Sequence, residues 1–379
     1  MEHYNPIFSK VPTLRFKKYD TNWNRKRLSD YVKKITQKNS NNIIKNVICN
    51  SAQNGLIPQL DFFDKEIAND ENTVGYYIIN NGDFVYNPRK SLNAPYGPVN
   101  MYKYEKAGIV SPLYLCFSVD ESINKSFLLQ RFKSPCWYRY IYLNGDSGAR
   151  HDRVSIKDDV FLSQPISLPS AEEQTDIAVF LEKIDERIEI QNKIISNYET
   201  LIKGLCDMIF RHNKSVSLSD LVKCKTSALQ ENTVSTCHRG EYKVLGASGA
   251  IAAIDTYQFE ESGILVLKDG SKAGKIQFAQ GKYSVVGTSV VLIPNEACDA
   301  RYLYFAMSSI DFEKYKVGSG IPHIYFKDYS NERIYYPEKA LRKKIIKTLD
   351  FYETRVEIER EMLSAMQKQK AFLLQSMFI

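Results

Sequence analysis

The sequence predicts an α/β (α+β) fold in which two mixed globular domains are separated by a long antiparallel two-helix coiled coil, as a pseudo-two-fold tandem duplication. Two observations lead to this prediction. A helical pattern occurs twice without a gap, 168 residues apart, at 169–210 and at 337–378. The residues that open each half also match, because Leu-Ser-Asp-Tyr-Val at 28–32 aligns with Leu-Ser-Asp-Leu-Val at 218–222.

The predicted order along the chain is domain, helix, domain, helix. The opening residues repeat at an offset of 190, whereas the helices repeat at 168. A drifting offset followed by a constant one indicates globular parts that diverged in loop length and helices that tolerated no insertion. We therefore place the first domain at 1–165, the first helix at 166–211, the second domain at 212–333 and the second helix at 334–379.

The first domain is basic and contains strand patterns. Tyr76–Ile79 and Phe84–Tyr86 read as strands, joined by an Asn-Asn-Gly-Asp turn signal. The segments 86–91 and 103–104 mix aromatic side chains with arginine or lysine. Residues 1–165 carry 23 Lys and Arg against 16 Asp and Glu, a net charge of +7. This excess is compatible with a nucleic-acid partner.

Both helical segments carry apolar residues in steps of four and three, which is the spacing of a coiled-coil seam. An ordinary helical hairpin inside one core is the alternative, but the pattern persists longer than in a globular helix. The predicted seam residues are Ile177, Leu181, Ile184, Ile188, Ile195, Ile202 and Leu205 in the first helix, and Ile345, Leu349, Val356, Leu363 and Leu373 in the second.

The two helices are expected to pair with each other. The first has a net charge of −4 and the second +3, which favours mutual pairing over pairing with a second copy. A two-fold relation between the halves makes the pair antiparallel, and about 40 residues give a rod about 60 Å long. Gln191 and Glu359 fall at seam positions, where they either are buried and fix the register or lie at a solvated edge.

The second domain has strand-like runs at 263–267 and 283–293. Between them lies Lys268–Lys275, with the sequence Lys-Asp-Gly-Ser-Lys-Ala-Gly-Lys. Its glycines allow close backbone approach, its lysines offer phosphate contacts, and Asp269 and Ser271 are suited to base edges. This loop is the best contact candidate in the chain, and a plain charged hairpin is the alternative.

Apparent catalytic motifs fail on inspection, so we predict that the chain is not an enzyme and binds no cofactor. Gly270–Lys275 is one residue short of a phosphate-binding loop and lacks the Ser or Thr after its lysine. Asn93–Tyr96 departs from the Asn-Pro-Pro-Tyr of amino-group DNA methyltransferases, and no Pro-Asp is present for a nuclease core. The five His and seven Cys show no metal-ligand spacing, and the Cys are interpreted as reduced packing residues.

A cytoplasmic protein without a membrane partner is expected. No run of the sequence approaches 18 apolar residues, and the N-terminal residues lack the character of a signal peptide.

Short motifs give the chain a resemblance to a known family. They are Val11–Phe16 with Trp23, Gly108–Tyr114, Leu168–Gln174 at the start of the first helix, and Ile321–Ile324 with Asp328 before the second helix. On these residues the chain resembles the specificity subunit of type I restriction-modification systems over essentially its whole length. The second copy departs from the pattern, because Tyr336–Arg342 replaces the Leu-Pro-x-x-x-Glu-Gln form.

This resemblance implies a function. In such subunits each globular part is a target-recognition domain that reads one half of a bipartite, asymmetric site in double-stranded DNA, and the helices set the unspecified gap. Methyltransferase subunits, two in number, dock on the spacer and the domains and flip the target adenine, and restriction (motor/endonuclease) subunits join through the complex. Half-sites about one helical turn apart are expected. Divergence between the two domains predicts two different half-sites.

For DNA contacts we choose basic and polar residues of the two candidate loops and of the Ser-Gly-Ala-Arg segment at 147–150, which the family places before the first helix. Any one of them is more readily a phosphate contact or a solvated charge than a base reader. The candidates are Arg89, Lys90, Lys103, Arg150, His151 and Arg153 in the first domain, and Lys268, Ser271, Lys272, Lys275, Ser319 and His323 in the second.

Two other classes of function stay open. A structural adaptor without a DNA role would keep the coiled coil and show no salt-dependent DNA binding. A stand-alone DNA methyltransferase or nuclease would need cofactor and nuclease motifs that we do not find.

Overall fold

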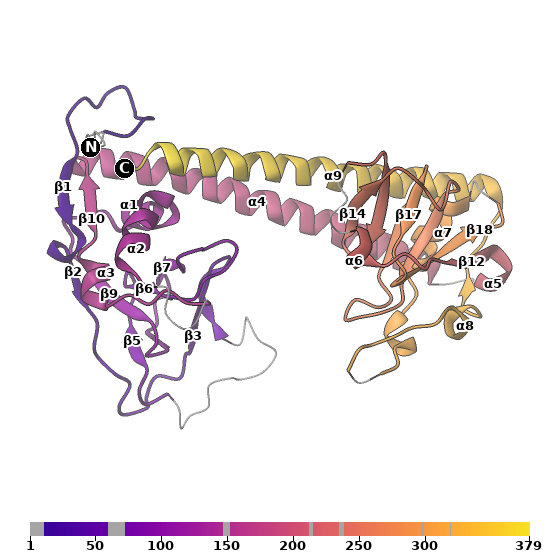
Figure 1. Ribbon diagram of the computed structural model, residues 1–379, viewed down its shortest axis with the longest axis horizontal. Coiled ribbons are helices and arrows are strands. Elements are labelled where there is room, and N and C mark those ends of the chain that lie inside the picture. Colours follow the sequence, from indigo (N-terminus) through magenta and orange to yellow (C-terminus); the bar gives the residue numbers. More distant parts are fainter. Residues whose placement is uncertain are drawn as a thin grey trace. The chain divides into compact units, whose positions relative to one another are not determined.

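A computed structural model describes residues 11–59, 73–146, 152–211, 215–234, 239–296, 299–318 and 320–379. The chain forms two compact units, of which the first comprises 1–190 with 363–379 and the second comprises 191–362. Each unit contains a mixed α/β domain and part of both long helices, α4 (Ala171–Phe210) and α9 (Lys339–Ser376), as Figure 1 shows. The predicted fold class, two α/β domains with two long packed helices, is confirmed.

A four-stranded antiparallel sheet organises the domain of the first unit, with the strand order β2-β9-β6-β7. Its two central strands are apolar, and the rings of Phe84 and Phe117 stack across them at 5.5 Å. The helix that follows β9 adds Phe127 and Phe132 to the same buried cluster. The elements are β2 (Val32–Lys34), β9 (Leu115–Val119), β6 (Phe84–Tyr86), β7 (Val99–Met101) and α1 (Lys125–Lys133).

Three strand pairs and four short helical segments complete this domain within the described residues. The pairs are β1 (Asn24–Arg27) with β10 (Pro165–Leu168), β3 (Ile48–Ser51) with β4 (Gly55–Pro58), and β5 (Tyr77–Ile79) with β8 (Gly108–Val110). The helical segments are η1 (Leu28–Asp30), η3 (Pro135–Trp137), α2 (Tyr138–Asn144) and α3 (Asp158–Leu162).

Both strands predicted around the Asn-Asn-Gly-Asp turn are present, but they belong to different sheets. β5 pairs with β8, whereas β6 pairs with β7 and β9. The carboxylate of Asp83 accepts a hydrogen bond from the backbone N–H of Asn80 at 2.7 Å, and the N–H of Gly82 donates to the carbonyl of Tyr102 at 2.8 Å. These bonds direct the chain from one sheet into the other.

The domain of the second unit is built on a four-stranded antiparallel sheet with the order β12-β18-β15-β16, and a three-stranded sheet with the order β14-β13-β17. The first consists of β12 (Val222–Thr226), β18 (Ser289–Pro294), β15 (Gly263–Leu267) and β16 (Ile276–Ala279), and the second of β14 (Gly249–Ile254), β13 (Tyr242–Gly246) and β17 (Tyr283–Val285). The other elements are β11 (Val216–Ser217), α5 (Leu218–Leu221), α6 (Glu231–Val234), α7 (Ala300–Met307), η5 (Phe312–Tyr315), α8 (Phe326–Tyr329) and β19 (Arg333–Ile334).

The strand-like run 283–293 is divided between the two sheets rather than forming one strand. β17 pairs with β13, and β18 pairs with β12 and β15. Between them the N–H of Val286 donates to the carbonyl of Leu245 and the N–H of Gly287 to that of Leu229. The chain therefore crosses from one sheet to the other at these two residues.

The duplication is visible in the sheet topology. Each four-stranded sheet has the same antiparallel order, and in each its first strand follows a Leu-Ser-Asp segment, η1 before β2 and α5 before β12. α1 follows β9 as α7 follows β18. The connection from β6 to β7 is thus the structural equivalent of the connection from β15 to β16.

The helices α4 and α9 pack together and run antiparallel. Within the second unit Gln191 bonds to Glu359, and the rings of Tyr198 and Tyr352 lie 6.4 Å apart. A step of seven residues forward along α4 therefore corresponds to a step of seven residues backward along α9. Every predicted seam residue is at least half-buried. Ile177, Leu181, Ile195, Ile345, Leu349, Val356 and Leu373 are buried, and Ile184, Ile188, Ile202, Leu205 and Leu363 are half-buried.

Both helices begin several residues later than the segments 166–211 and 334–379 suggest. Residues 165–168 pair with β1, and α4 begins at Ala171, where the hydroxyl of Ser170 accepts from the N–H of Glu173 at 3.2 Å. Ile334 pairs with Val216, and α9 begins at Lys339. Residues shortly before each helix therefore lie in strands that pair with distant parts of the chain.

The polar seam position is buried rather than solvated. Gln191 is 4% exposed and Glu359 is 5% exposed. The amide of Gln191 donates to the carbonyl of Glu359 at 3.0 Å and to its carboxylate at 2.6 Å. Because the two residues occupy equivalent positions of the duplicated helices, the antiparallel pairing brings each residue to its own counterpart. Such a buried polar pair fixes the register of the helices.

Asp185 of α4 joins three helices of the first unit. It accepts from Gln130 at 2.8 Å and Lys133 at 3.0 Å of α1, and it pairs with Lys370 of α9. Burial opposes ionisation of Asp185, but the charges of Lys133 and Lys370 outweigh it and lower its pKa to about 2. The charged form of this carboxylate therefore stabilises the fold.

Replacing Asp185 with Asn is expected to remove stability that depends on pH. The folded-state pKa lies below the unfolded value near 3.8, so the contribution is present above about pH 4 and is lost as the pH falls toward 2. Its size at pH 7 is at most about 2 kcal/mol, since the side chain is 31% exposed.

Urea unfolding at several pH values, compared with the exposed Asp207→Asn variant, measures this difference. A loss of stability that stays constant between pH 7 and pH 2 would contradict the assignment.

Candidate nucleic-acid interface

The loop Lys268–Lys275 connects β15 to β16 and is shaped by two glycines. Gly270 and Gly274 have φ values of +95° and +90°. A Cβ on Gly274 would lie 2.5 Å from the Cβ of Phe312, so this position excludes a larger residue. Ser271, Lys272 and Lys275 are exposed, and Lys268 is half-buried. The loop therefore presents three lysines and a serine on a constrained backbone.

A second segment, 322–324, pairs with the start of this loop. The N–H of Gly270 donates to the carbonyl of Pro322 at 3.0 Å, and the N–H of Ile324 donates to that of Lys268 at 2.9 Å. These bonds place Asp269 directly opposite His323. Nδ1 of His323 lies 2.8 Å from Oδ1 of Asp269, and Nζ of Lys268 lies 3.9 Å from Oδ2. The predicted contacts Lys268, Ser271, Lys272, Lys275 and His323 are thus gathered around one loop.

The equivalent loop of the first unit is built by the same bonds. The N–H of Lys90 donates to the carbonyl of Asp152 at 2.8 Å, and the N–H of Val154 donates to that of Pro88 at 2.9 Å. Arg89 therefore lies directly opposite Arg153. Arg89 and Arg153 are 64 positions apart in the sequence. They occupy the positions in the first unit that Asp269 and His323 occupy in the second.

The Arg89–Arg153 pair has no counter-ion among the described residues. Like charges directly opposite on paired strands destabilise by roughly 0.2 to 1 kcal/mol. Nε of Arg153 is also buried and without a hydrogen-bond partner within the described part of the chain, and an unsatisfied donor costs about 1 to 3 kcal/mol. An external acceptor that binds the two guanidinium groups relieves the repulsion between them, so the pair is suited to acceptor groups of a ligand.

A cavity of about 240 Å³ lies beside the two arginines. Its lining includes Asn50, Asn87 and Tyr114. Burial raises the pKa of Tyr114, and the neighbouring charges of Arg153 and Arg89 oppose that rise. Tyr114 was not among the predicted contacts, because nothing in its local sequence indicates that β8 and β9 carry it to this loop.

Lys103 is not brought to these loops. Lys103 follows β7 beyond Met101, which pairs with Phe84, whereas Arg89 lies beyond the opposite end of the same strand pair, where Tyr86 meets Val99. Arg150, His151 and Ser319 lie outside the described residues.

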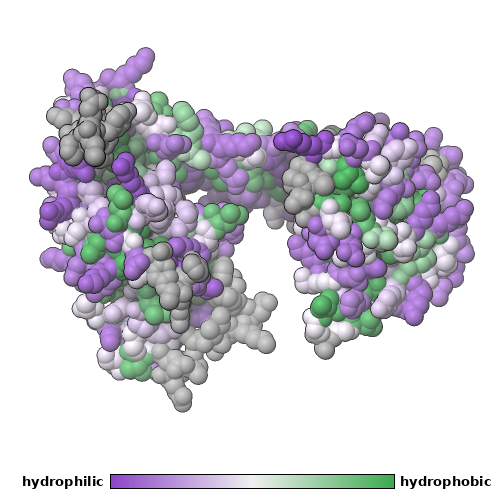
Figure 2. Space-filling view, viewed as in Figure 1, coloured by the Kyte–Doolittle hydropathy of each residue, from purple (hydrophilic) through white to green (hydrophobic). Residues whose placement is uncertain are grey.

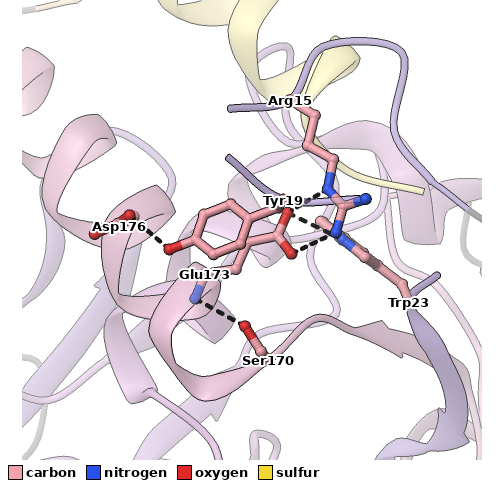
Figure 3. Close-up of polar contacts among 6 residues, drawn as sticks. All are labelled: Arg15, Tyr19, Trp23, Ser170, Glu173 and Asp176. Carbon is pink, nitrogen blue, oxygen red and sulfur yellow. Dashed lines mark hydrogen bonds and ion pairs between the residues drawn. The ribbon is translucent and has the colours of Figure 1, made fainter. Parts of the chain in front are cut away.

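The motifs at the N-terminus and at the start of α4 meet in the first unit (Figure 3). Nε and Nη2 of Arg15 each donate to the carboxylate of Glu173 at 2.7 Å, and Nε1 of Trp23 donates to it at 3.3 Å. The hydroxyl of Tyr19 donates to Asp176 at 2.7 Å. The side chain of Glu173 is 0% exposed, so this network fixes the N-terminal segment to α4.

Among the described residues, no group of three His, Cys, Asp or Glu side chains could hold a metal ion. Their five cysteines, Cys49, Cys116, Cys136, Cys206 and Cys224, are free. None of the helices in the described ranges is long and apolar enough to span a membrane.

Comparison with known proteins gives one family. A family model described as the type I restriction modification DNA specificity domain matches residues 20–199 and again 211–367. The specificity subunit of the type I restriction enzyme MjaVIII from Methanocaldococcus jannaschii is 27% identical over 122 residues, which are 31% of this chain and 28% of that protein. The match thus spans less than a third of this relative.

Two solved structures share the fold. The S subunit of a type I restriction-modification system from M. genitalium superposes with a TM-score of 0.59 at 14% identity, covering 97% of this chain and 99% of that one. A chain from a study of complex assembly and conformational transition of the type I system gives 0.55 at 14% identity, covering 93% and 96%.

Proposed function

The chain belongs to the family of type I restriction-modification DNA specificity proteins, and from this premise we propose that it reads a bipartite, asymmetric site in double-stranded DNA without catalysing a reaction itself. The family confirms the resemblance drawn from the sequence. The observation that carries the proposal is the identical construction of two loops, β6–β7 and β15–β16, each crossed by a second segment that brings charged side chains together. Such a surface is repeated once for each half-site.

We take 1–165 and 212–333 as the two target-recognition domains. The loop geometry supports contacts from Arg89, Lys90 and Arg153 in one and from Lys268, Ser271, Lys272, Lys275 and His323 in the other. The two cross-strand pairs differ, with two arginines in the first domain and Asp269 with His323 in the second. Two domains with different pairs support two different half-sites. Lys103, Arg150, His151 and Ser319 remain proposed contacts on the basis of the sequence.

The helices are proposed to set the gap between the half-sites. α4 is one continuous helix of 40 residues, which corresponds to about 60 Å. Its pairing with α9 is held in register by the buried Gln191–Glu359 pair. A spacer of fixed length and register is what a constant gap requires.

Methyltransferase subunits are the proposed partners of the helices, and restriction subunits join through the complex, acting in the cytoplasm. Figure 2 shows hydrophobic residues between hydrophilic ones on the visible face of the helices. Among the exposed apolar residues of the described helices, only Ile190 and Ile358 occupy equivalent positions of the duplication. The other exposed apolar positions differ between the helices, so we propose that the two helices do not dock their partners identically. The exposed apolar residues are Val179, Phe180, Ile190, Leu201 and Met208 on α4, and Leu341, Phe351, Ile358, Met362 and Phe372 on α9.

The proposal is tested by DNA binding of the complex reconstituted from this chain and its methyltransferase subunits. Affinity should fall linearly with salt on logarithmic axes, and Lys272→Ala should weaken all sequences alike and reduce that slope by about 1. The exposed Lys339→Ala on α9 is a charge-matched control. A structural adaptor would form the complex and show no salt-dependent binding, and a stand-alone methyltransferase would modify DNA without the other subunits.

A further inference from the structure

We propose that the cross-strand pair at the base of each loop, Arg89–Arg153 in the first domain and Asp269–His323 in the second, is the base-reading position, and that its chemistry selects guanine in one half-site and cytosine in the other. This inference rests on the proposed function. It goes further by assigning one position in each domain and the base that each position selects.

The backbone makes these pairs suitable as readers. In both domains the hydrogen bonds run between the residues that flank the pair, from Lys90 to Asp152 and from Gly270 to Pro322, for example. The pair itself is then of the non-hydrogen-bonded type, whose Cα atoms approach to about 4.5 Å and whose side chains project from the same face. Two side chains are thereby held next to each other by a short ladder rather than by a free loop.

The arginine pair presents only donors. Guanidinium groups carry five N–H donors and no acceptor. Guanine is the base that offers two acceptors, O6 and N7, on its major-groove edge, and arginine binds both at once. None of the described residues supplies an acceptor for either guanidinium. Nε of Arg153 is buried, so the donors available to guanine are those of the exposed Arg89 and the terminal Nη groups of the half-buried Arg153.

The aspartate–histidine pair presents acceptors. The contact of 2.8 Å between Nδ1 of His323 and Oδ1 of Asp269 requires a proton on Nδ1, and in the tautomer of the neutral imidazole that has this proton Nε2 is an acceptor beside the carboxylate. An ionised carboxylate only accepts, and its base partner is the N4 amino group of cytosine. Adenine also has an amino group, but its N7 acceptor beside that group would face a second acceptor.

The experiment measures the base preference of the reconstituted complex with DNA libraries randomised at each half-site. Alanine at Arg89 or Arg153 should remove a preference for guanine of about 5- to 150-fold at one position of one half-site. Asp269→Asn should shift one position of the other half-site from cytosine toward adenine, because an amide both donates and accepts. Lys272→Ala, in the same loop, should leave every preference unchanged while lowering affinity for all sequences.

A second variant keeps the inference testable if a single substitution disrupts the loop. Asp269→Arg combined with His323→Arg reproduces the pair of the first domain and should change the selected cytosine to guanine. The inference is overturned if both this variant and Asp269→Asn keep the original preferences, or weaken all sequences alike. Failure of the proposed function is distinct, because the unmodified complex would then show no sequence preference at either half-site.

Discussion

Replacing Asp299 with Asn is expected to destabilise the protein by about 3 to 5 kcal/mol, and adding Arg342→Gln is expected to recover most of that loss. Asp299 and Arg342 form a buried pair, with side chains 4% and 8% exposed. Nε and Nη2 of Arg342 donate to the two carboxylate oxygens at 2.9 and 3.1 Å. A neutral residue at 299 leaves the guanidinium buried without its counter-ion, which is the origin of the large effect.

The expected recovery comes from the other copy of the duplication. Arg342 corresponds to Gln174, and each donates to the carbonyl of the proline that precedes its helix, at 2.7 Å for Pro337 and 3.1 Å for Pro169. Asp299 precedes α7 as Asn124 precedes α1, and Gln174 accepts from the N–H of Asn124 at 3.0 Å. The first copy therefore joins the same two positions by an uncharged contact, between the side chain of Gln174 and the backbone N–H of Asn124.

Denaturant unfolding of the wild type, both single variants and the double variant forms a complete cycle. The double variant should lie within about 1 kcal/mol of the wild type, since neither charge of the buried pair is then left without its counter-ion. Glu261→Gln, which breaks the exposed pair with Lys225, is the control and should change stability by less than about 0.5 kcal/mol. A double variant as unstable as Asp299→Asn would contradict the equivalence of the two copies.

This pair also explains why the second copy departs from the sequence motif of the first. The Glu-Gln ending of the motif places Glu173 against Arg15 and Trp23, and Gln174 against Asn124. In the second copy Leu341 and Arg342 stand at these positions. The contact of Gln174 has a counterpart there, the ion pair between Arg342 and Asp299. The apolar Leu341 cannot replace the carboxylate of Glu173.

The helices and the duplication could be predicted from the sequence because both depend on local spacing. A seam with a period of 3.5 residues identifies α4 and α9 without knowledge of the rest of the chain. The first residue of each helix could not be predicted in this way, because residues 165–168, just before α4, pair with β1, more than 130 positions away. The division of the strand-like run 283–293 between two sheets was not predictable, because strand propensity does not show that Val286 and Gly287 bond to different neighbours.

The candidate site was predictable only in part, for the same reason. Glycine and lysine in Lys268–Lys275 identify a surface loop from composition alone. The partner His323 lies 54 positions beyond Asp269, and the backbone bonds of segment 322–324 bring it there. Arg89 and Arg153 were both chosen as contacts, but their direct opposition, and the proximity of Tyr114, follow from strand pairing that no short motif encodes.

Removing one facing heptad from each helix is expected to shorten the preferred gap between half-sites by about 3 base pairs. The contacts Gln191–Glu359 and Tyr198–Tyr352 define which residues face each other, so deletion of 192–198 matches deletion of 352–358. Seven residues at about 1.5 Å each shorten a helix by about 10.5 Å, and base pairs are stacked about 3.4 Å apart. Loss of a whole heptad leaves the seam facing its partner.

Sequencing of methylated adenines in DNA exposed to the reconstituted complex gives the gap directly. The variant Asn197→Ala, an exposed position inside the deleted heptad, keeps the helix length and should keep the gap. Deletion of 192–198 alone brings non-matching residues of α9 against α4, and it should reduce stability and site-specific binding together. A doubly shortened chain that folds, binds its partners and methylates at the original gap would show that the helices hold the domains without measuring the DNA.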